Sequence, residues 1–352
     1  IALPGSASCL GLSAEKARYA EETGRAIMTL VEKNITCRDI ITRESLENAI
    51  TVLMASGGST NLIIHLIAIA RRAGIELSLD DFERIGRTTP VLVNVKPHGS
   101  GGLDFHNAGG VRALMKELES RLHTDCLTVS GGTVGENLKS ADLPYDRDII
   151  RPLDDPLTSQ GGIAVLRGNL APRGAVLKRS AASERLMRHR GPAKVFDDLD
   201  ACRAYLLDEG SDLDENTVVV LRGYGPCGAP GMPEGGNSLP LPPKLKRRGI
   251  TDYVRVTDSR MSGGCFGTQV LHVSPESAVG GPLAALRDGD IIHLDVDAGL
   301  LEVELSDAEL KARLDGFKPT LHPEIERGFV RNFIDNVTQA DEGCDLTYLQ
   351  YR

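Results

Sequence analysis

The spacing of apolar residues indicates that the first 140 residues are mainly helical. Apolar side chains recur there at every third or fourth position, which is the period of an amphipathic helix. One predicted helix begins after the capping residue Ser13 and a second begins after Thr42. The apolar face of the first helix is formed by Ala20, Gly24, Ile27, Met28 and Val31. The segment "STNLIIHLIAIARRAG" is apolar on nearly every side, which predicts a buried helix that ends at Gly74.

The pattern changes in the second half of the chain. Two short runs in the first half, 90–95 and 125–131, predict strands, so that half is expected to be α/β. After Gly161, short apolar runs are separated by glycines, which predicts an antiparallel or mixed β-barrel or sandwich. The runs are "GGIAVLRGNL", "GAVLKRS", "AKVF", "TVVVLRG", "DYVRVTD", "QVLHVS", "DIIHLDV" and "LLEVELS". Two short helices are predicted among them, near 199–208 and 306–314.

We therefore expect an α/β protein in which a helical α/β portion precedes a C-terminal β-barrel-like domain. The boundary is placed around residue 155, where Pro152 and Pro156 flank a pair of aspartates. Residues 1–155 are predicted to be the α/β part and residues 156–352 the barrel.

Composition excludes several classes of function. The chain has 352 residues and a formal net charge of −9, which argues against a nucleic-acid-binding surface. No apolar run approaches the roughly 20 residues that a membrane span needs. Seven cysteines occur without a C-x-x-C pair, which favours a reducing cytoplasm over a disulfide framework. The same spacing provides no closed set of ligands for a metal cluster.

Three glycine-rich stretches carry the candidate chemistry. In "ASGGSTN" (55–61), backbone N–H groups with Ser59 and Thr60 at a helix N-terminus could hold a carboxylate or phosphate. The alternative is a helix break with an N-cap. The second stretch, "GYGPCGAPGMPEGGN" (223–237), is a stiff loop that presents one carboxylate, Glu234. Such a carboxylate is either a solvated surface charge or one oxygen ligand of a cation such as Mg²⁺.

The third stretch, "RVTDSRMSGGCFG" (255–267), places Ser262 before two glycines at the end of a strand. It does not match the G-x-S-x-G elbow of serine hydrolases, because Arg260 stands at the first glycine position. No Asp/His pair is evident as partners of an acyl-transfer serine, which makes a hydrolase improbable. Free N–H groups and a nearby metal would stabilise an alkoxide at this serine. The residues alone favour a plain turn.

Taken together and in order, these stretches resemble the dihydroxy-acid and phosphogluconate dehydratase family, and within it the arabinonate-type sugar-acid branch. The resemblance runs from the first residue to the last. It is carried by "IALPGSA", "ENAITVLMASGGSTNLIIHLIAIA", "HNAGGVRALMKEL", "YDRDIIRPLDDPLTSQGGIAVLRGNLAPRGAVLK", "GAPGMPE", "VTDSRMSGG", "HVSPESAVGGPLA" and "VTQADEGCDLTYL". The segment "LPLPPKLKRRGI" after Glu234 is similar to the sugar-acid branch.

The resemblance implies a hydro-lyase that converts a 2,3-dihydroxy sugar acid into a 2-keto-3-deoxy acid. It implies an iron–sulfur cluster that acts on the leaving hydroxyl, and Mg²⁺ that holds the substrate carboxylate. By motif, Ser262 is the base that takes the C2 proton and Glu234 is a Mg²⁺ ligand. Ser59, Thr60, Asn61, Arg260 and Gly263 are expected to contact the substrate. The expected assembly is a homodimer or tetramer in the cytoplasm, with a small-molecule substrate and neither nucleic acid nor membrane as partner.

One departure from the family is large. In the family, "IALPGSA" follows a region that carries the cluster cysteines and the other Mg²⁺ ligands, and that region is not in this chain. None of the seven cysteines matches a cluster ligand. We therefore expect the chain as it stands to have an incomplete first domain, to be inactive, and to bind neither a cluster nor tight Mg²⁺. Without that region, apolar surface of the helical half is expected to be exposed around "NLIIHLIAIA", and this half is expected to hold a dimer or larger assembly. The alternatives are a dihydroxy-acid dehydratase of branched-chain amino-acid synthesis and a non-catalytic fragment for packing or dimerisation.

Overall fold

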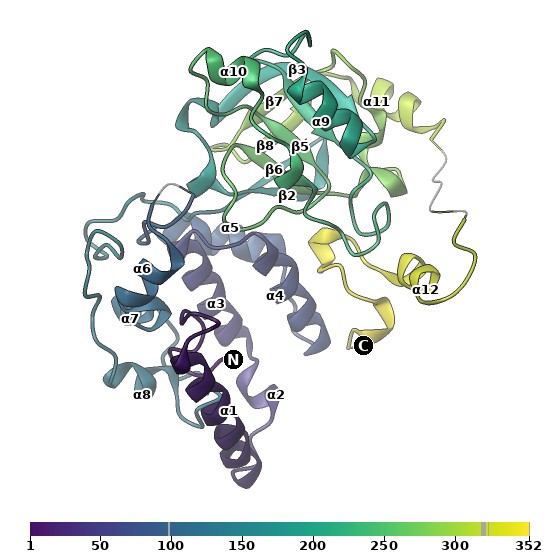
Figure 1. The fold of residues 1–352 in the computed structure, drawn as a ribbon. Helices are drawn as coiled ribbons and strands as arrows, with labels where there is room; N and C mark the ends of the chain where they lie inside the picture. The colour runs from purple at the N-terminus through teal and green to yellow at the C-terminus, as the bar shows by residue number, and fades with distance from the viewer. Residues whose placement is uncertain (98, 318–321, 323, 352) are drawn as a thin grey trace. The chain divides into compact units, whose positions relative to one another are not determined.

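The computed structural model describes residues 1–97, 99–317, 322 and 324–351. Its fold consists of two compact units, and Figure 1 shows the elements of each. The first unit comprises Ile1–Gly58, Ala70–Leu77 and Asp81–Gly162, and the second comprises Ser59–Ile69, Ser78–Asp80 and Ile163–Arg352. Among the described residues, no helix is both long enough and apolar enough to cross a membrane.

The first half of the chain is helical, as its apolar spacing predicted. Ser13 accepts a hydrogen bond from the backbone N–H of Lys16 (3.1 Å) and caps the first helix. Thr42 caps the third helix, which ends at Gly57 in the left-handed conformation (φ 55°). The helices are α1 (Ala14–Glu32), α2 (Cys37–Ile40), α3 (Arg43–Ser56), α4 (Asn61–Arg72), α5 (Leu79–Thr88), α6 (Gly102–Asn107), α7 (Gly110–Glu117) and α8 (Val134–Lys139).

The apolar face of α1 is exposed. Ile27, Met28 and Val31 keep 53%, 56% and 65% of their accessible surface, and only Leu30 of this helix is buried. In α4, by contrast, Ile63 and Ile67 are buried, as the sequence predicted. The expectation that apolar surface would be exposed around "NLIIHLIAIA" was therefore wrong, and the exposed apolar face lies on α1.

The two strands predicted in the first half do not form. Val91, Val93 and Leu127 make only isolated β-bridges. The backbone N–H groups of Leu92 and Val93 donate to the carbonyl of Ala55, near the end of α3, at 2.8 and 3.3 Å. The segment also pairs with 149–158, where Val91 N donates to Thr158 O at 3.1 Å and Asn94 N donates to Ile149 O at 2.8 Å. Because a helix end takes the N–H groups between these two contacts, the pairing is limited to isolated bridges.

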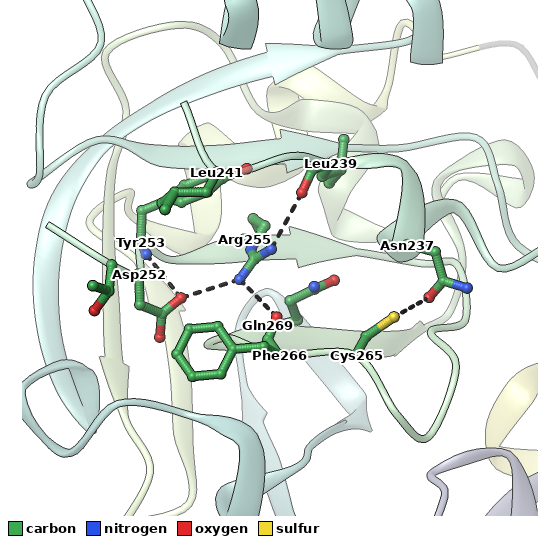
Figure 2. A pocket seen from close by; sticks show the side chains of 11 residues that line it. Asn237, Leu239, Leu241, Asp252, Tyr253, Arg255, Cys265, Phe266 and Gln269 are labelled. Carbon is green, nitrogen blue, oxygen red and sulfur yellow. Dashed lines mark hydrogen bonds and ion pairs between the residues drawn. The ribbon is translucent and has the colours of Figure 1, made fainter. Parts of the chain in front are cut away.

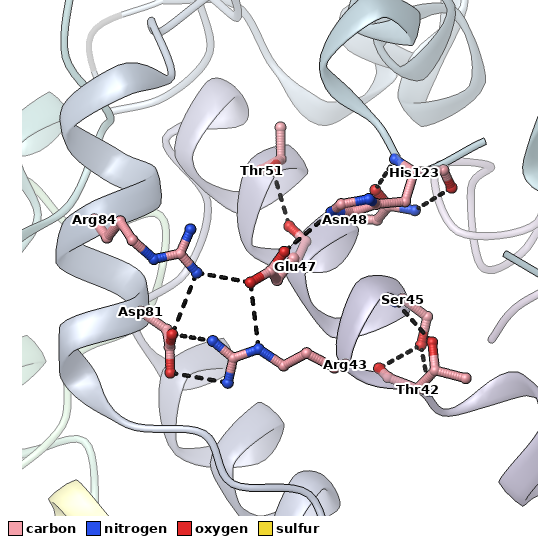
Figure 3. Close-up of polar contacts among 9 residues, drawn as sticks. All are labelled: Thr42, Arg43, Ser45, Glu47, Asn48, Thr51, Asp81, Arg84 and His123. Atoms are coloured by element: carbon pink, nitrogen blue, oxygen red, sulfur yellow. Dashed lines mark hydrogen bonds and ion pairs between the residues drawn. The ribbon is translucent and has the colours of Figure 1, made fainter. Parts of the chain in front are cut away.

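Charged side chains join α3 to α5 in the first unit (Figure 3). Arg43 of α3 forms an ion pair with Asp81 of α5, and Glu47 accepts a hydrogen bond from Arg84 at 2.6 Å. His123 reaches the second oxygen of Glu47 at 3.0 Å. Although burial raises the pKa of Glu47, the hydrogen bonds from Arg84 and His123 outweigh it and hold this pKa below its usual value.

All eight strand predictions for the second half are confirmed, and the strands close into a barrel. They are β1 (Ala164–Gly168), β2 (Ala171–Leu177), β3 (Arg188–Phe196), β4 (Val218–Leu221), β5 (Arg255–Thr257), β6 (Gln269–Ser274), β7 (Ile291–Asp295) and β8 (Leu300–Val303). Their order around the barrel is β1-β2-β6-β5-β4-β3-β7-β8. The strand pairs are of mixed direction, because β3, β4, β5 and β6 run parallel in succession while β2 and β7 pair antiparallel with their neighbours.

The barrel interior is filled by small and branched side chains. Leu166, Val220, Val256, Val270 and Leu301 are among those with essentially no exposed surface. The helices of this half are α9 (Leu199–Leu207), α10 (Pro243–Arg247), α11 (Asp307–Leu314) and α12 (Phe329–Asn336), and α9 and α11 match the two predicted helices. Short 3₁₀ turns are η1 (Glu119–Arg121), η2 (Arg179–Ala181), η3 (Glu184–Leu186), η4 (Gly235–Ser238), η5 (Ser277–Val279), η6 (Pro282–Ala285), η7 (Ala340–Glu342) and η8 (Thr347–Leu349).

Candidate active site

Two loops of the barrel bring the candidate residues together. The loop after β4 carries Glu234, and the loop after β5 carries Ser262. Because β4 and β5 are parallel neighbours, both loops leave the same end of the barrel, where α/β proteins commonly bind ligands. The loops are also joined by backbone hydrogen bonds, from Arg260 N to Pro233 O (3.3 Å) and from Gly236 N to Arg260 O (3.1 Å).

The Glu234 carboxylate is held by two amide side chains. Asn61 donates to its Oε1 at 2.9 Å, and Asn237 donates to its Oε2 at 3.0 Å. Asn61 comes from the start of α4, so the first glycine-rich stretch reaches the second one. A carboxylate accepts through about four lone pairs, so two directions on Glu234 remain available for a ligand or an ion.

Asn237 also fixes the turn that contains Ser262. Its Oδ1 accepts the backbone N–H of Ser262 at 2.7 Å and the Cys265 thiol at 2.9 Å. The backbone N–H of Cys265 donates to Ser262 O at 3.1 Å and closes the turn. Glu234 and Ser262 are thus separated by one side chain, and the Ser262 side chain is half-buried.

The other candidate residues belong to the same loop as Ser262 or to the start of α4. Ser59 lies against Gly263, where an added Cβ would come within 2.9 Å of the Ser59 Cβ, so the turn needs glycine there. Ser59 also accepts the N–H of Asn61, the first residue of α4, at 3.3 Å. Thr60 is 1% exposed and its hydroxyl has no partner among the described residues. The side chain of Arg260 donates through its Nε to the Met232 carbonyl at 2.5 Å.

A cavity of about 230 Å³ lies beside the turn (Figure 2). Asn237, Cys265, Arg255 and Gln269 are among the residues that line it. The Arg255 guanidinium is buried and pairs with Asp252 at 3.1 Å. Since Asp252 also accepts the N–H and hydroxyl of Thr268, this pair fixes the end of the loop that carries Ser262.

The residues around Glu234 fit a magnesium ion. Mg²⁺ is commonly bound through one or two carboxylates, with water or substrate oxygens completing the shell. Glu234 provides a carboxylate, and the buried Oδ1 of Asn61 has no partner among the described residues. Both are hard oxygen donors. In the described part of the chain, no three His, Cys, Asp or Glu side chains group closely enough to form a complete site.

In the part of the chain that the structure describes, the cysteines are not gathered as the ligands of an iron–sulfur cluster would be. Cluster ligands are thiolates, which form where the thiol pKa is low. Burial instead raises the pKa of Cys202 and of Cys344 to about 12, and it raises that of Cys227 further. The pKa of Cys265 is also raised, first by burial and then by the Glu234 charge. These thiols are therefore protonated at neutral pH.

The sequence did not predict two residues that contact the Ser262 turn, Asn237 and Lys178. Asn237 lies three residues after Glu234, inside the quoted loop, but nothing in its spacing shows that it joins two loops. Lys178 follows β2 within the run "GAVLKRS", and the sequence predicts only a strand there. A lysine placed directly after a fully apolar strand end was the available signal, because lysine is seldom buried without a reason.

The fold and the site together define the class of protein. It is an α/β protein with a closed mixed barrel, and its serine turn and carboxylate loop meet at one end of that barrel. The C-terminal model of the dihydroxy-acid/6-phosphogluconate dehydratases matches residues 148–344, and the N-terminal model matches residues 1–137. The chain belongs to the dihydroxy-acid/6-phosphogluconate dehydratase family, as the resemblance of its motifs predicted.

Relatives with assigned names come from both branches of the family. The chain is 48% identical to an L-arabonate dehydratase of Azospirillum brasilense, over 99% of this chain and 61% of that protein. It is 48% identical to a 6-deoxy-6-sulfo-D-gluconate dehydratase of Pseudomonas putida, over 99% of this chain and 60% of that protein. It is 45% identical to a dihydroxy-acid dehydratase of Sulfurisphaera tokodaii, over 98% and 61% respectively. The chain thus spans about three fifths of the length of these relatives.

Proposed function

We propose that this chain contributes the base and one metal ligand to a hydro-lyase that dehydrates a 2,3-dihydroxy sugar acid. The observation that carries the proposal is the single side chain, Asn237, that separates the Ser262 turn from the Glu234 carboxylate. Family membership supports dehydration, and the names of two similar relatives favour a sugar acid over a branched-chain substrate.

In the proposed reaction, deprotonated Ser262 takes the proton from C2 of the substrate. The electron pair of that C–H bond forms the C2–C3 double bond, and the C3 hydroxyl leaves as hydroxide. The hydroxide takes up a proton from solvent to give water, and Ser262 returns its proton to solvent. The resulting enol tautomerises to the 2-keto-3-deoxy acid. Mg²⁺, when bound, would supply positive charge for the substrate carboxylate and the 2-hydroxyl, with Glu234 as its ligand. Ser59, Thr60, Asn61 and Gly263 would line the substrate side.

The proposed base is a weak acid that needs its surroundings. A serine hydroxyl does not ionise at neutral pH unless nearby positive charge and N–H donors stabilise the alkoxide. No step is assigned to an iron–sulfur cluster, because the described cysteines do not fit one. The seven free cysteines support a reducing cytoplasm as the location.

The decisive experiment is replacement of Ser262 in the holoenzyme. Ser262→Ala should lower kcat at least ~100-fold with metal content unchanged, the usual scale for loss of a general base. Glu234→Gln should instead raise the Mg²⁺ concentration needed for half-maximal activity. The matched control is Ser120→Ala, at an exposed serine of the first unit, which should leave both quantities unchanged. Near-normal turnover by Ser262→Ala would exclude Ser262 as the base.

A further inference from the structure

Lys178 is a buried cation that no carboxylate neutralises. It follows the last residue of β2 and is 3% exposed. Its Nζ donates a hydrogen bond to the carbonyl of Gly263, the residue after Ser262. Within the described chain it forms no ion pair, whereas the other cation at this place, Arg255, is paired with Asp252.

An unpaired ammonium in this position is costly to the folded protein. Burial disfavours the charged form by several kcal/mol unless an anion or strong acceptors compensate it. Burial accordingly lowers the pKa of Lys178 to about 8, and Cys265 opposes this shift. At neutral pH the side chain is still mostly charged. The charged form of Lys178 would therefore be stabilised by any anion that forms beside it.

Among the described residues, no neighbouring carboxylate or thiolate is paired with Lys178. The Cys265 thiol is protonated, because burial and the Glu234 charge both raise its pKa. The Glu234 carboxylate takes its hydrogen bonds from the amides of Asn61 and Asn237, and not from Lys178. The remaining candidate in the turn is the hydroxyl of Ser262, whose peptide carbonyl precedes Gly263 and whose N–H is fixed by Asn237.

We propose that Lys178 is the positioning residue of the base: it fixes the Gly263 carbonyl, and its positive charge favours the deprotonated form of the Ser262 hydroxyl. This inference rests on the proposed role of Ser262. Lys178 acts through the Gly263 peptide and its electric field, and it needs no contact with the substrate. Together, Lys178 and Asn237 hold the turn at two successive residues.

Three variants in the holoenzyme separate charge from shape. Lys178→Gln keeps a donor but removes the charge, and it should lower kcat ~30-fold or more while KM changes less than ~3-fold. Lys178→Arg keeps the charge and should retain kcat within ~10-fold of the parent. The matched control is Lys194→Gln, at a barrel lysine that is paired with Asp288 at 2.7 Å, and it should leave kcat unchanged.

A second measurement needs no turnover and no bound metal. Loss of the ammonium should raise the pKa of the Cys265 thiol and slow its alkylation by iodoacetamide at pH 8 by ~3-fold or more, followed by mass spectrometry of its peptide. Lys178→Arg should react like the parent chain. An unchanged alkylation rate in Lys178→Gln would overturn the inference even if that variant lost activity through misfolding.

The two proposals fail in different ways. If Ser262→Ala keeps its turnover, the proposed function falls, and the role of Lys178 falls with it. If Ser262→Ala is inactive but Lys178→Gln matches the parent in kcat and in Cys265 reactivity, only the inference about Lys178 is wrong. A loss of kcat in Lys178→Arg as large as in Lys178→Gln would show that shape, and not charge, is what the turn requires.

Discussion

At the scale of single residues, the geometry of the proposed site depends on Asn237. Its amide donates to Glu234 and accepts from Ser262 and Cys265, so one side chain sets the separation of the proposed ligand and the proposed base. Because Asn237 itself is exposed, its removal should cost little stability. Its effect should therefore be seen in catalysis.

We expect Asn237→Leu to lower kcat ~10-fold or more in the holoenzyme. The change keeps the size of the side chain but leaves the Ser262 N–H and the Glu234 carboxylate without their partner, and small displacements of catalytic groups are costly. Steady-state kinetics with a thermal melt of the same sample would measure this. Asn336→Leu, at a half-buried asparagine of α12, is the control. Equal kcat values for Asn237→Leu and the control would rule out the positioning role.

A second residue-scale feature is His272, a buried histidine in β6 with a positive φ of 55°. Neither ring nitrogen has a partner among the described residues. Burial first, and then the charges of Arg260 and His65, lower its pKa from 6.5 to about 3. Between pH 6.5 and pH 3, His272 is therefore protonated in the unfolded chain and neutral in the folded chain. This contribution to stability is present above pH 6.5 and is lost as the pH falls towards 3.

We expect His272→Asn to reduce the acid sensitivity of folding. Each pH unit below 6.5 should cost the parent protein about 1.4 kcal/mol of unfolding free energy through this residue. Asparagine tolerates a positive φ and does not titrate, so the variant should lose about 2 kcal/mol less between pH 6.5 and pH 4.5. Urea denaturation at both pH values measures the difference. Parallel losses in parent and variant would mean that His272 is protonated in the folded state.

At the scale of elements, much of the barrel could be predicted because each strand is locally encoded. Runs such as "TVVVLRG" are apolar, β-branched and bounded by glycine or polar residues, so their type does not depend on the partner. Strand order could not be predicted in this way, since parallel pairing of β4 with β5 depends on the crossover between them.

Dependence on partners far away in the sequence also explains the other features that the sequence did not predict. The run at 90–95 has the composition of a strand, but the N–H groups of Leu92 and Val93 bond to the carbonyl of Ala55 in a helix end that is distant in the sequence. The motifs indicated Glu234 and Ser262, whereas Asn237 and Lys178 act through contacts between segments far apart in the chain. Hydrogen bonds of that kind leave no periodic signal in the sequence.

The ion network between α3 and α5 is also an element-scale feature with a measurable effect. We expect Asp81→Asn to lower the unfolding free energy by about 1 kcal/mol, since Asp81 is 14% exposed and accepts from Arg43 within a network. Raising the salt concentration to 1 M should reduce this difference, because screening weakens ion pairs. The exposed pair of Glu83 and Arg87 on the same helix provides the control, and Glu83→Gln should change stability by less than about 0.5 kcal/mol. A Glu83→Gln effect as large as that of Asp81→Asn would contradict the network role.

At the scale of the whole molecule, the exposed face of α1 bears on assembly. Ile27, Met28 and Val31 form a stripe that monomeric proteins seldom leave in water. We propose that a second copy of the chain covers this stripe, in keeping with the expected dimer or tetramer, and that residues 1–155 and 156–352 act as separate domains.

We expect Met28→Glu to weaken self-association at least ~10-fold, because it places a charge within an apolar contact. Light scattering across a micromolar concentration series would measure the change. Glu21→Gln, at a residue of α1 that pairs with Arg25 on the helix surface, should not alter the association. A parent chain that stays monomeric throughout the series would refute this mode of assembly.

The loop after β4 consists of two parts with different roles. Residues 231–237 contain the carboxylate and the asparagine that join the loop to the Ser262 turn, while residues 238–250 continue through α10 and return to β5. Both ends are anchored on neighbouring strands of a closed barrel, so exposed positions of the second part, such as Lys246 and Arg247, can vary in sequence without moving the first. For the proposed dehydratase, this arrangement marks the exposed positions of 238–250 as the ones to randomise when a changed substrate preference is sought.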